Sequence, residues 1–276
     1  MNYTISDKLK GMPIPNVINL KECVDRKEYT LTEFKKLGVD KVNIHSYDRY
    51  NENSIPFTGD PELINVIAKG VTSSHLLTIK HWYENTDEEY GIFFEDDVDF
   101  STVQHWNFTL EEFIERCGSK WGALHLCNVF EYPYNPNEEY AGLVAMVPRQ
   151  RQIFDHGLQC YVLKRWYAKK IIDYYFDDWQ IEGSIHIRMP LGSPPAFENN
   201  LLHGFGLVVS FPLFNQNIID FRSKNIYFYN QQAQSAIYSY EFTRDWWQEK
   251  GSSMSLEDIF NNYKPENFIK HRININ

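Results

Sequence analysis

The stretch YGIFFEDDVDF at residues 90–100 joins a short apolar run to a group of acidic residues. The apolar part, residues 91–94, is typical of a buried strand in a parallel sheet, because such strands are covered by helices on both faces. The acidic part then lies at the C-terminal end of that strand. Open α/β sheets bind their ligands at this edge, so the stretch predicts an α/β fold with a site there.

The acids of this stretch predict a cation site. Side chains alternate along a strand, so we expect Glu95, Asp97 and Asp99 on one side and Asp96 on the other. Carboxylates gathered on one side suit a hard divalent cation such as Mg²⁺ or Mn²⁺, which prefers oxygen ligands. A solvated acidic turn is the alternative interpretation. Carboxylates crowded at the end of a buried strand repel one another, and this favours a bound cation or proton.

Length and charge limit the class of protein. The chain has 276 residues, enough for one large domain with a sizeable core. Its formal net charge of −10 argues against a nucleic-acid-binding protein, whose affinity depends on basic surface. The cysteines lack metal-binding spacing and are expected to be reduced thiols in the interior. We find no signal peptide and no run of about 20 apolar residues, so we expect a cytoplasmic protein without a transmembrane segment.

The first part of the chain predicts a βαβ unit. A strand within residues 12–20 is followed by a helix that starts at Asp25 and ends at Gly38, and a second strand follows at 39–45. This pattern is typical of a parallel sheet. No G-x-G-x-x-G sequence follows the first strand, so a standard dinucleotide site is not expected.

The rest of the chain predicts further helices and strands, without an internal repeat. The expected elements are helices at 61–69 and 73–83 separated at Gly70, a helix capped by Thr109, a strand at 121–126, an exposed aromatic loop at 130–140, a strand within 155–163, a helix at 166–175, an edge or bent strand at 207–214, and one or two terminal helices. We expect residues 1–229 to form the main domain and residues 230–276 to form a helical extension packed on it.

Five segments, in the same order across residues 14–225, resemble glycosyltransferase family 25, the bacterial lipooligosaccharide and collagen glycosyltransferases. They are VINLKECVDRKEYTLTEFKKLGV, GVTSSHLLTIKHW, FFEDDV, DHGLQCYVLKR and VVSFPLFNQN. Each motif is weak alone, but five in the correct order form a strong signal. The resemblance implies a GT-A fold, in which a Rossmann-like, mainly parallel sheet binds a nucleotide sugar together with Mn²⁺ or Mg²⁺.

The resemblance also implies an activity. It indicates a hexosyltransferase, galactosyl or glucosyl, that moves a sugar from a nucleotide-sugar donor to a saccharide or glycoconjugate acceptor, as in lipopolysaccharide biosynthesis. A UDP-sugar is the favoured donor, and inversion at the anomeric carbon is favoured. Two alternatives remain open. One is a metal-dependent phosphodiester or nucleotide hydrolase, and the other is a catalytically inactive carbohydrate-binding protein with the same fold.

The matching positions give candidate binding residues. Glu95 and Asp97 hold the acidic positions of the family's metal motif, and Asp99 gives a literal D-x-D one step later, so the register stays open. The candidate nucleotide-binding residues are Asn19, Leu20, Arg26, Ser74, His75 and Asp96. Arg26 offers a bidentate partner for phosphate, although a helix cap or a pair with Asp25 is an equal alternative.

The helix within the second segment suggests a phosphate contact. Ser74 and His75 are expected to begin that helix, and a helix N-terminus can donate to phosphate oxygens. A histidine that satisfies the core is the alternative role for His75.

A catalytic base is needed for inversion, because the acceptor hydroxyl must lose its proton. Asp178 and Glu182 are the candidates, and neither register matches the family cleanly. Asp155 and His156 are candidates for a third protein contact to the cation. A turn cap is the alternative role for Asp155.

Overall fold

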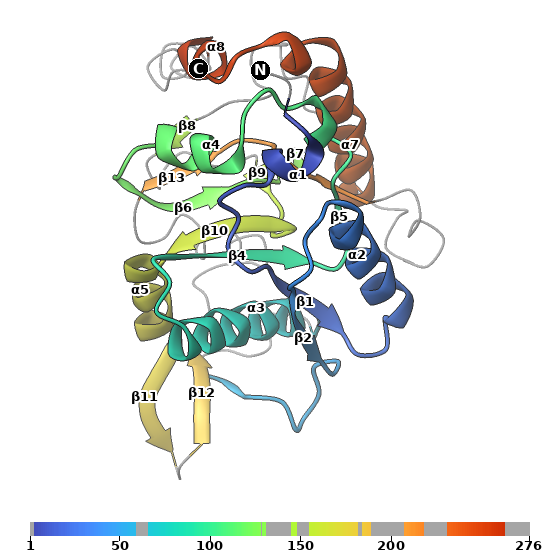
Figure 1. The fold of residues 1–276 in the computed structure, drawn as a ribbon. Helices are drawn as coiled ribbons and strands as arrows, with labels where there is room; N and C mark the ends of the chain where they lie inside the picture. The colour runs from blue at the N-terminus through green and yellow to red at the C-terminus, as the bar shows by residue number, and fades with distance from the viewer. Residues whose placement is uncertain are drawn as a thin grey trace, which may run out of the picture.

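A seven-stranded mixed sheet forms the centre of the computed structural model (Figure 1). The structure describes residues 3–58, 66–127, 129–130, 145–147, 155–181, 184–188, 207–217 and 231–262. In spatial order the strands are β2 (Asn43–Tyr47), β1 (Asn16–Leu20), β4 (Tyr90–Glu95), β10 (Cys160–Lys164), β6 (Trp121–His125), β13 (Leu207–Ser210) and β8 (Ala145–Val147). All run in one direction except β10 and β8, which are antiparallel to their neighbours. The sheet is therefore mainly parallel, as the sequence predicts.

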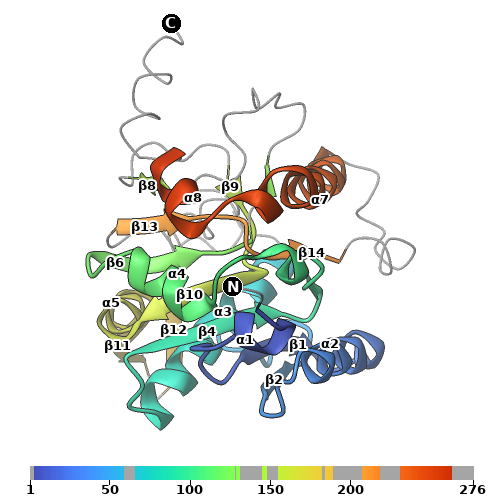
Figure 2. The same cartoon turned by 45° about the horizontal axis from the view of Figure 1, so that its top comes forward.

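Helices cover both faces of this sheet (Figure 1, Figure 2). One buried cluster receives side chains from α2 (Val24–Lys36), α4 (Leu110–Arg116), α7 (Gln231–Glu249) and α8 (Leu256–Asn262), and a second receives them from α3 (Val66–Asn85) and α5 (Arg165–Tyr175). Strand β4 contributes to both, with Ile92 and Phe94 in the first cluster and Phe93 in the second. This alternation is expected of a central strand that is buried on both sides.

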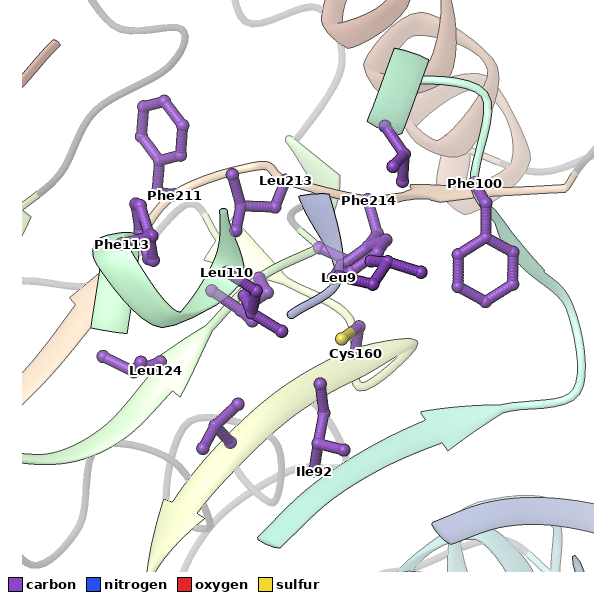
Figure 3. Packing of buried hydrophobic residues seen from close by; sticks show 14 of the residues in the cluster. Leu9, Ile92, Phe100, Leu110, Phe113, Leu124, Cys160, Phe211, Leu213 and Phe214 are labelled. Carbon is purple, nitrogen blue, oxygen red and sulfur yellow. The ribbon is translucent and has the colours of Figure 1, made fainter. Parts of the chain in front are cut away.

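The first cluster anchors the strands that lead to the acidic stretch. Figure 3 shows Ile92 of β4, Leu124 of β6 and Cys160 of β10 near Leu110 of α4 and Phe214, which follows β13. All five side chains are fully buried. Burying a leucine, isoleucine or phenylalanine contributes about 1.5–3 kcal/mol each, so this contact region holds the centre of the sheet rigidly.

Shorter elements complete the described chain. They are α1 (Ile5–Lys8), β3 (Phe57–Thr58), β5 (Val98–Asp99), η2 (Val103–His105), β7 (Val129–Phe130), β9 (Asp155–His156), β11 (Phe176–Ile181), β12 (Ser184–Arg188), β14 (Asn215–Gln216) and η6 (Gly251–Ser253). Strands β11, β12 and β3 form a small sheet, while β14 pairs with β5 and β7 pairs with β9. Within the described ranges, no helix has both the length and the apolar character needed to cross a membrane.

Local sequence signals explain where two of the helices begin or end. Helix α2 is followed by Gly38, whose φ of +80° is the left-handed conformation that often ends a helix. Helix α4 begins with a capping box, because Thr109 Oγ1 accepts from the backbone N–H of Glu112 while the Glu112 carboxylate accepts from the Thr109 N–H at 2.7 Å. Both predicted boundaries are confirmed.

The predicted helix break at Gly70 is wrong. Helix α3 runs without interruption from Val66 to Asn85. A glycine inside a helix costs only about 1 kcal/mol, and the burial of Leu76, Ile79 and Trp82 in the same helix outweighs that cost. The part of the expected first helix before residue 66 lies outside the described residues.

Two strand predictions also need correction. Strand β13 is not an edge strand, because it lies between β6 and β8, and Pro212 follows the strand instead of interrupting it. Strand β2 begins at Asn43 and not at residue 39. The aromatic loop at 131–140 and the expected domain boundary at 229 lie outside the described residues. Trp247 of α7 is fully buried in the first cluster and donates to the Pro212 carbonyl at 2.8 Å.

Candidate functional site

The acidic cluster lies where β4 ends. Glu95 is the last residue of β4, Asp96 and Asp97 form a turn, and the chain then enters β5. Strand β1 is parallel to β4, so Asn19 and the start of α2 reach the same edge of the sheet (Figure 1). The backbone N–H of Asn217, directly after β14, donates to the Asp97 carbonyl at 2.6 Å. Segments from both halves of the chain therefore meet at this turn.

Arg26, on the first turn of α2, binds both acids of the turn. Its guanidinium contacts Asp96 Oδ1 and lies 3.0 Å from Asp97 Oδ2. The prediction that Asp96 faces away from Asp97 is therefore wrong, because the chain leaves strand geometry after Glu95. The guanidinium balances one negative charge of the cluster.

Partners from β1 and α2 hold Asp96. Asn19 Nδ2 donates to Asp96 Oδ2 at 2.6 Å, and Thr30 Oγ1 donates to the Asp96 carbonyl at 2.7 Å. Only 3% of Asp96 is exposed. Burial raises the pKa of Asp96 to about 7, because the loss of solvation outweighs the attraction of Arg26 and the negative charge of Asp97 adds to it. Burial therefore favours the protonated form of this carboxyl.

Asn19 serves mainly to position Asp96. Its Nδ2 also donates to the Cys23 carbonyl at 3.2 Å, and its Oδ1 accepts from Ser46 Oγ at 3.1 Å. The amide is thus engaged by the protein at both ends. A contact of Asn19 with a nucleotide stays a prediction.

Asp97 has a carboxylate oxygen that no described group satisfies. Its Oδ2 contacts Arg26 and accepts from Gln216 Nε2 at 3.1 Å. Its Oδ1 is buried and has no hydrogen-bond partner within the described residues. Burial raises the pKa of Asp97, the charge of Glu95 adds to the rise, and Arg26 opposes it. A buried acceptor left open in this way is a position for a cation or a ligand donor.

Glu95 faces α3, whereas Asp97 contacts Arg26 of α2, so the prediction that Glu95 shares one side with Asp97 is also wrong. Its Oε1 lies 3.1 Å from Nε2 of His75, and Nδ1 of the same ring lies 2.9 Å from the hydroxyl of Tyr161 on β10. His75 is 1% exposed and Tyr161 is fully buried. His75 therefore contacts a candidate metal ligand, which its place in the sequence alone does not indicate.

The three candidate metal ligands lie near enough to Cys127, two residues after β6, for their charges to affect its thiol. Burial raises the pKa of the Cys127 thiol far above its usual value, and the charges of Asp97, Glu95 and Asp99 raise it further. Asp99 also caps a turn, because its Oδ1 accepts from the backbone N–H of Ser101 at 3.0 Å. Asp99 thus has a local partner, whereas Asp97 Oδ1 has none in the described part of the chain.

The prediction that Ser74 and His75 begin a helix is wrong. Both lie in the third turn of α3, where backbone N–H groups are already used within the helix and are not available to phosphate. Ser74 Oγ donates to the Val71 carbonyl at 2.9 Å. Leu20 is the last residue of β1 and pairs with Tyr47 of β2, at the edge that carries the acidic turn.

The candidate bases lie away from the acidic turn or outside the described residues. Asp178 is on β11, and in both views β11 and β12 lie on the side where β4 begins, while the acidic turn is at its other end (Figure 1, Figure 2). Glu182 lies outside the described residues, as do the side chains of Asp178, Asp155 and His156. Their proposed roles stay predictions.

The donor atoms suit a cation that is shared with a ligand. Within the described ranges, no group of three or more His, Cys, Asp or Glu side chains is arranged to hold a metal ion alone. Among the described residues, Asp97 Oδ1 has no hydrogen-bond partner, and Glu95 contacts His75 through Oε1. Mg²⁺ typically binds one or two carboxylates and takes its other oxygens from phosphates and water. Two carboxylates therefore suffice for such a cation only when a phosphate-bearing ligand supplies further oxygens.

Comparisons with known proteins do not identify a family. No family model and no curated protein sequence matches the chain. Among solved structures, the chain is similar to A197 from STIV (13% identity, TM-score 0.34, 74% of this chain and 84% of that chain). It is also similar to HddC from Yersinia pseudotuberculosis (13% identity, TM-score 0.35, 77% and 97%) and to HddC complexed with GMP-PN (12% identity, TM-score 0.32, 81% and 98%). Likenesses at these TM-scores carry no argument about function.

Fold and site together define a mixed α/β protein with a buried acidic site at one edge of its sheet. Sequence reasoning did not assign three residues of this site: Thr30, Tyr161 and Gln216. The last two lie within segments that resemble the family, DHGLQCYVLKR and VVSFPLFNQN, so the signal for them was present. Thr30 lies within an ordinary helical pattern and had no such signal.

Proposed function

We propose that the chain is a metal-dependent glycosyltransferase of the GT-A type. It transfers a hexose, galactose or glucose, from a nucleotide-sugar donor to a saccharide or glycoconjugate acceptor with inversion, and UDP-sugars are the favoured donors. Three features support this proposal. They are the five segments that resemble family 25, the mainly parallel sheet, and the buried acidic site at the end of β4.

The proposal depends chiefly on the open oxygen of Asp97. Glu95, Asp96 and Asp97 crowd three carboxyl groups at one strand end, and Arg26 supplies one positive charge to them. Ionised carboxylates in this setting repel one another unless a cation or a proton is present. A divalent cation at Asp97 Oδ1 would satisfy the open acceptor and remove the remaining charge imbalance.

Each residue of the site has a distinct role in this proposal. Asp97 and Glu95 would hold the cation, which would supply positive charge to stabilise the departing nucleotide diphosphate. Arg26 neutralises part of the acidic turn and would be near enough to bind phosphate, because a guanidinium forms bidentate contacts with phosphate. Asn19 holds Asp96 in place.

Of the two candidate bases for the acceptor proton, Asp178 lies on β11, on the side of the sheet where β4 begins, and Glu182 lies outside the described residues, so neither residue is assigned that role. We further propose that the aromatic loop at 130–140 binds the acceptor, because flat tyrosine rings suit sugar faces.

A thermal-shift panel tests the function. Wild-type protein is heated with UDP-, GDP- or CMP-sugars, each with Mn²⁺ or with a chelator, beside Asp97→Asn and the surface control Asp173→Asn. A ligand at a hundred times its Kd stabilises the folded state by about 2.7 kcal/mol, which shifts the Tm by several degrees. We expect this shift for wild type and the control with one class of nucleotide sugar and Mn²⁺, and its loss in Asp97→Asn.

A product assay separates the alternatives. Sugar transfer to an acceptor, with release of nucleoside diphosphate, supports the proposal. Cleavage of phosphodiesters without sugar transfer favours a hydrolase, and glycan binding without nucleotide binding favours an inactive carbohydrate-binding protein. No shift with any nucleotide sugar would overturn the proposed function.

A further inference from the structure

A chain of buried hydrogen bonds leads from Glu95 into the core. His75 Nε2 lies 3.1 Å from Glu95 Oε1, and His75 Nδ1 lies 2.9 Å from the Tyr161 hydroxyl. The three residues come from β4, α3 and β10, so the fold alone brings them together. His75 and Tyr161 are almost completely shielded from water, at 1% and 0% exposure. The hydrogen bond between His75 and Tyr161 is therefore shielded from water, whereas the Glu95 side chain is partly exposed.

The two partners of His75 define which nitrogen carries the proton. An ionised carboxylate only accepts hydrogen bonds, so Nε2 of His75 carries the proton that it donates to Glu95. In a neutral imidazole, Nδ1 is then an acceptor, and the Tyr161 hydroxyl donates to it. Burial raises the pKa of Tyr161 well above its usual value, so the hydroxyl keeps its proton.

Tyr161 is itself held firmly. Its ring stacks on Phe93 of the neighbouring strand, with centroids 5.2 Å apart and an interplanar angle of 15°. Residues 161 and 93 are also directly paired in the sheet. The hydroxyl therefore has a fixed position relative to β4, which carries Glu95.

We propose that Tyr161 is a positioning residue for the cation site. Through His75 it holds Oε1 of Glu95 toward α3 and so directs Oε2 of the same carboxylate to the cation and the bound ligand. This inference rests on the proposed function, because it takes Glu95 as a metal ligand. Hydrogen-bonded neighbours that orient a metal ligand typically contribute about 10- to 100-fold to metal affinity.

Removal of the hydroxyl loosens the hold on His75. In Tyr161→Phe, Nδ1 of the buried ring loses its donor, while the Glu95 carboxylate still requires the proton on Nε2. The ring is then fixed by one of these two hydrogen bonds, so the orientation of the Glu95 carboxylate is less well defined. A cation that depends on this orientation would bind less tightly.

Tyr161→Phe is best compared with Tyr47→Phe. Tyr47 on β2 also sends its hydroxyl to α3, where it lies 2.9 Å from Thr78 Oγ1, but it does not touch His75. Both variants thus remove a hydroxyl contact between the sheet and the same helix. The first measurement is the ¹⁵N chemical shift of both His75 nitrogens in metal-free protein. The second is the Mn²⁺ affinity in the presence of UDP.

We expect a proton on Nε2 in all three proteins, and a changed ¹⁵N shift of Nδ1 in Tyr161→Phe only, because that nitrogen loses its hydrogen bond. We expect the Mn²⁺ affinity to fall about tenfold in Tyr161→Phe only. Unchanged ¹⁵N shifts together with unchanged affinity would overturn the inference. Failure of wild type to bind Mn²⁺ with any nucleotide would instead overturn the proposed function, and the ¹⁵N shift of Nδ1 would still decide whether Tyr161 donates to His75.

A double mutant separates positioning from packing. In His75→Gln, the side-chain amide can donate to Glu95 without help from Tyr161. Tyr161→Phe should therefore cause no further loss of Mn²⁺ affinity in the His75→Gln background. Additive losses would show that the Tyr161 hydroxyl acts independently of His75, contrary to the inference.

Discussion

Asp96→Asn should remove a pH dependence of stability that runs opposite to ordinary acid denaturation. The folded protein raises the pKa of Asp96 from 3.8 to about 7, chiefly through burial. Between these two values the folded state holds a proton that the unfolded chain has released. The free energy of unfolding therefore gains a contribution as the pH falls from 7 toward 4, and loses it as the pH rises through 7.

The magnitude follows from the shift. A shift of one pKa unit corresponds to about 1.4 kcal/mol, so the contribution of Asp96 changes by about 3 kcal/mol between pH 8 and pH 5. Asn at this position cannot accept from both Arg26 and Asn19, and the lost hydrogen bond costs about 1–3 kcal/mol. That cost is the same at both pH values. The stability difference between variant and wild type should therefore change between pH 8 and pH 5 only through titration, in which Asp96 and its neighbour Asp97 take part together.

The assay is urea unfolding of metal-free protein at pH 5, 6, 7 and 8, followed by tryptophan fluorescence. Asp258→Asn is the control, because the Ser255 hydroxyl lowers the pKa of Asp258 and its carboxylate stays ionised throughout this range. We expect Asp96→Asn to be the less stable protein at pH 5 and to gain about 3 kcal/mol relative to wild type by pH 8. An equal difference at pH 5 and pH 8 would refute this reasoning.

Three further predictions test the site and the core. Asp97→Ala should abolish metal-dependent nucleotide affinity without lowering the free energy of unfolding at pH 8, because burial disfavours its ionised carboxylate; a clear loss of stability by urea unfolding would contradict this. Arg26→Ala should raise the donor KM far more than the acceptor KM in steady-state kinetics, and an effect on the acceptor alone would place Arg26 outside the donor site. Gly91→Ala should lower the free energy of unfolding by about 1–3 kcal/mol, because a Cβ there would lie 2.6 Å from Cε2 of Trp82. Gly70→Ala should raise it by up to about 1 kcal/mol, because the atom nearest to its Cβ would be 3.5 Å away. Equal Tm values for the two variants would contradict both expectations.

Local sequence signals predicted most elements of the fold. Apolar alternation, the helix cap at Thr109 and the glycine after α2 are short-range features, and the structure contains the elements they indicate. Long-range choices were not predictable. The antiparallel direction of β10 depends on its pairing with β4 and β6, and the continuity of α3 through Gly70 depends on burial against the sheet. No local sequence pattern indicates the direction of β10 or the continuity of α3.

The candidate site was predictable in outline. The sequence placed Arg26 among the candidate nucleotide-binding residues and the acids at the end of a strand, and in the structure Arg26 contacts two of these acids. The side assigned to Asp96 was wrong, because strand alternation was extended into a turn. The contact between His75 and Tyr161 joins residues 86 positions apart, and only the folded chain reveals it.

The central claim is that carboxylates at the end of β4 hold a divalent cation together with a nucleotide diphosphate. The most direct test is calorimetric titration of UDP into wild type and Asp97→Asn, with Mn²⁺ and with a chelator. For wild type we expect at least about tenfold tighter binding with Mn²⁺, equivalent to about 1.4 kcal/mol, and for Asp97→Asn no gain from the metal. Equal UDP affinity of wild type with and without Mn²⁺, or a full metal-dependent gain in Asp97→Asn, would contradict the claim.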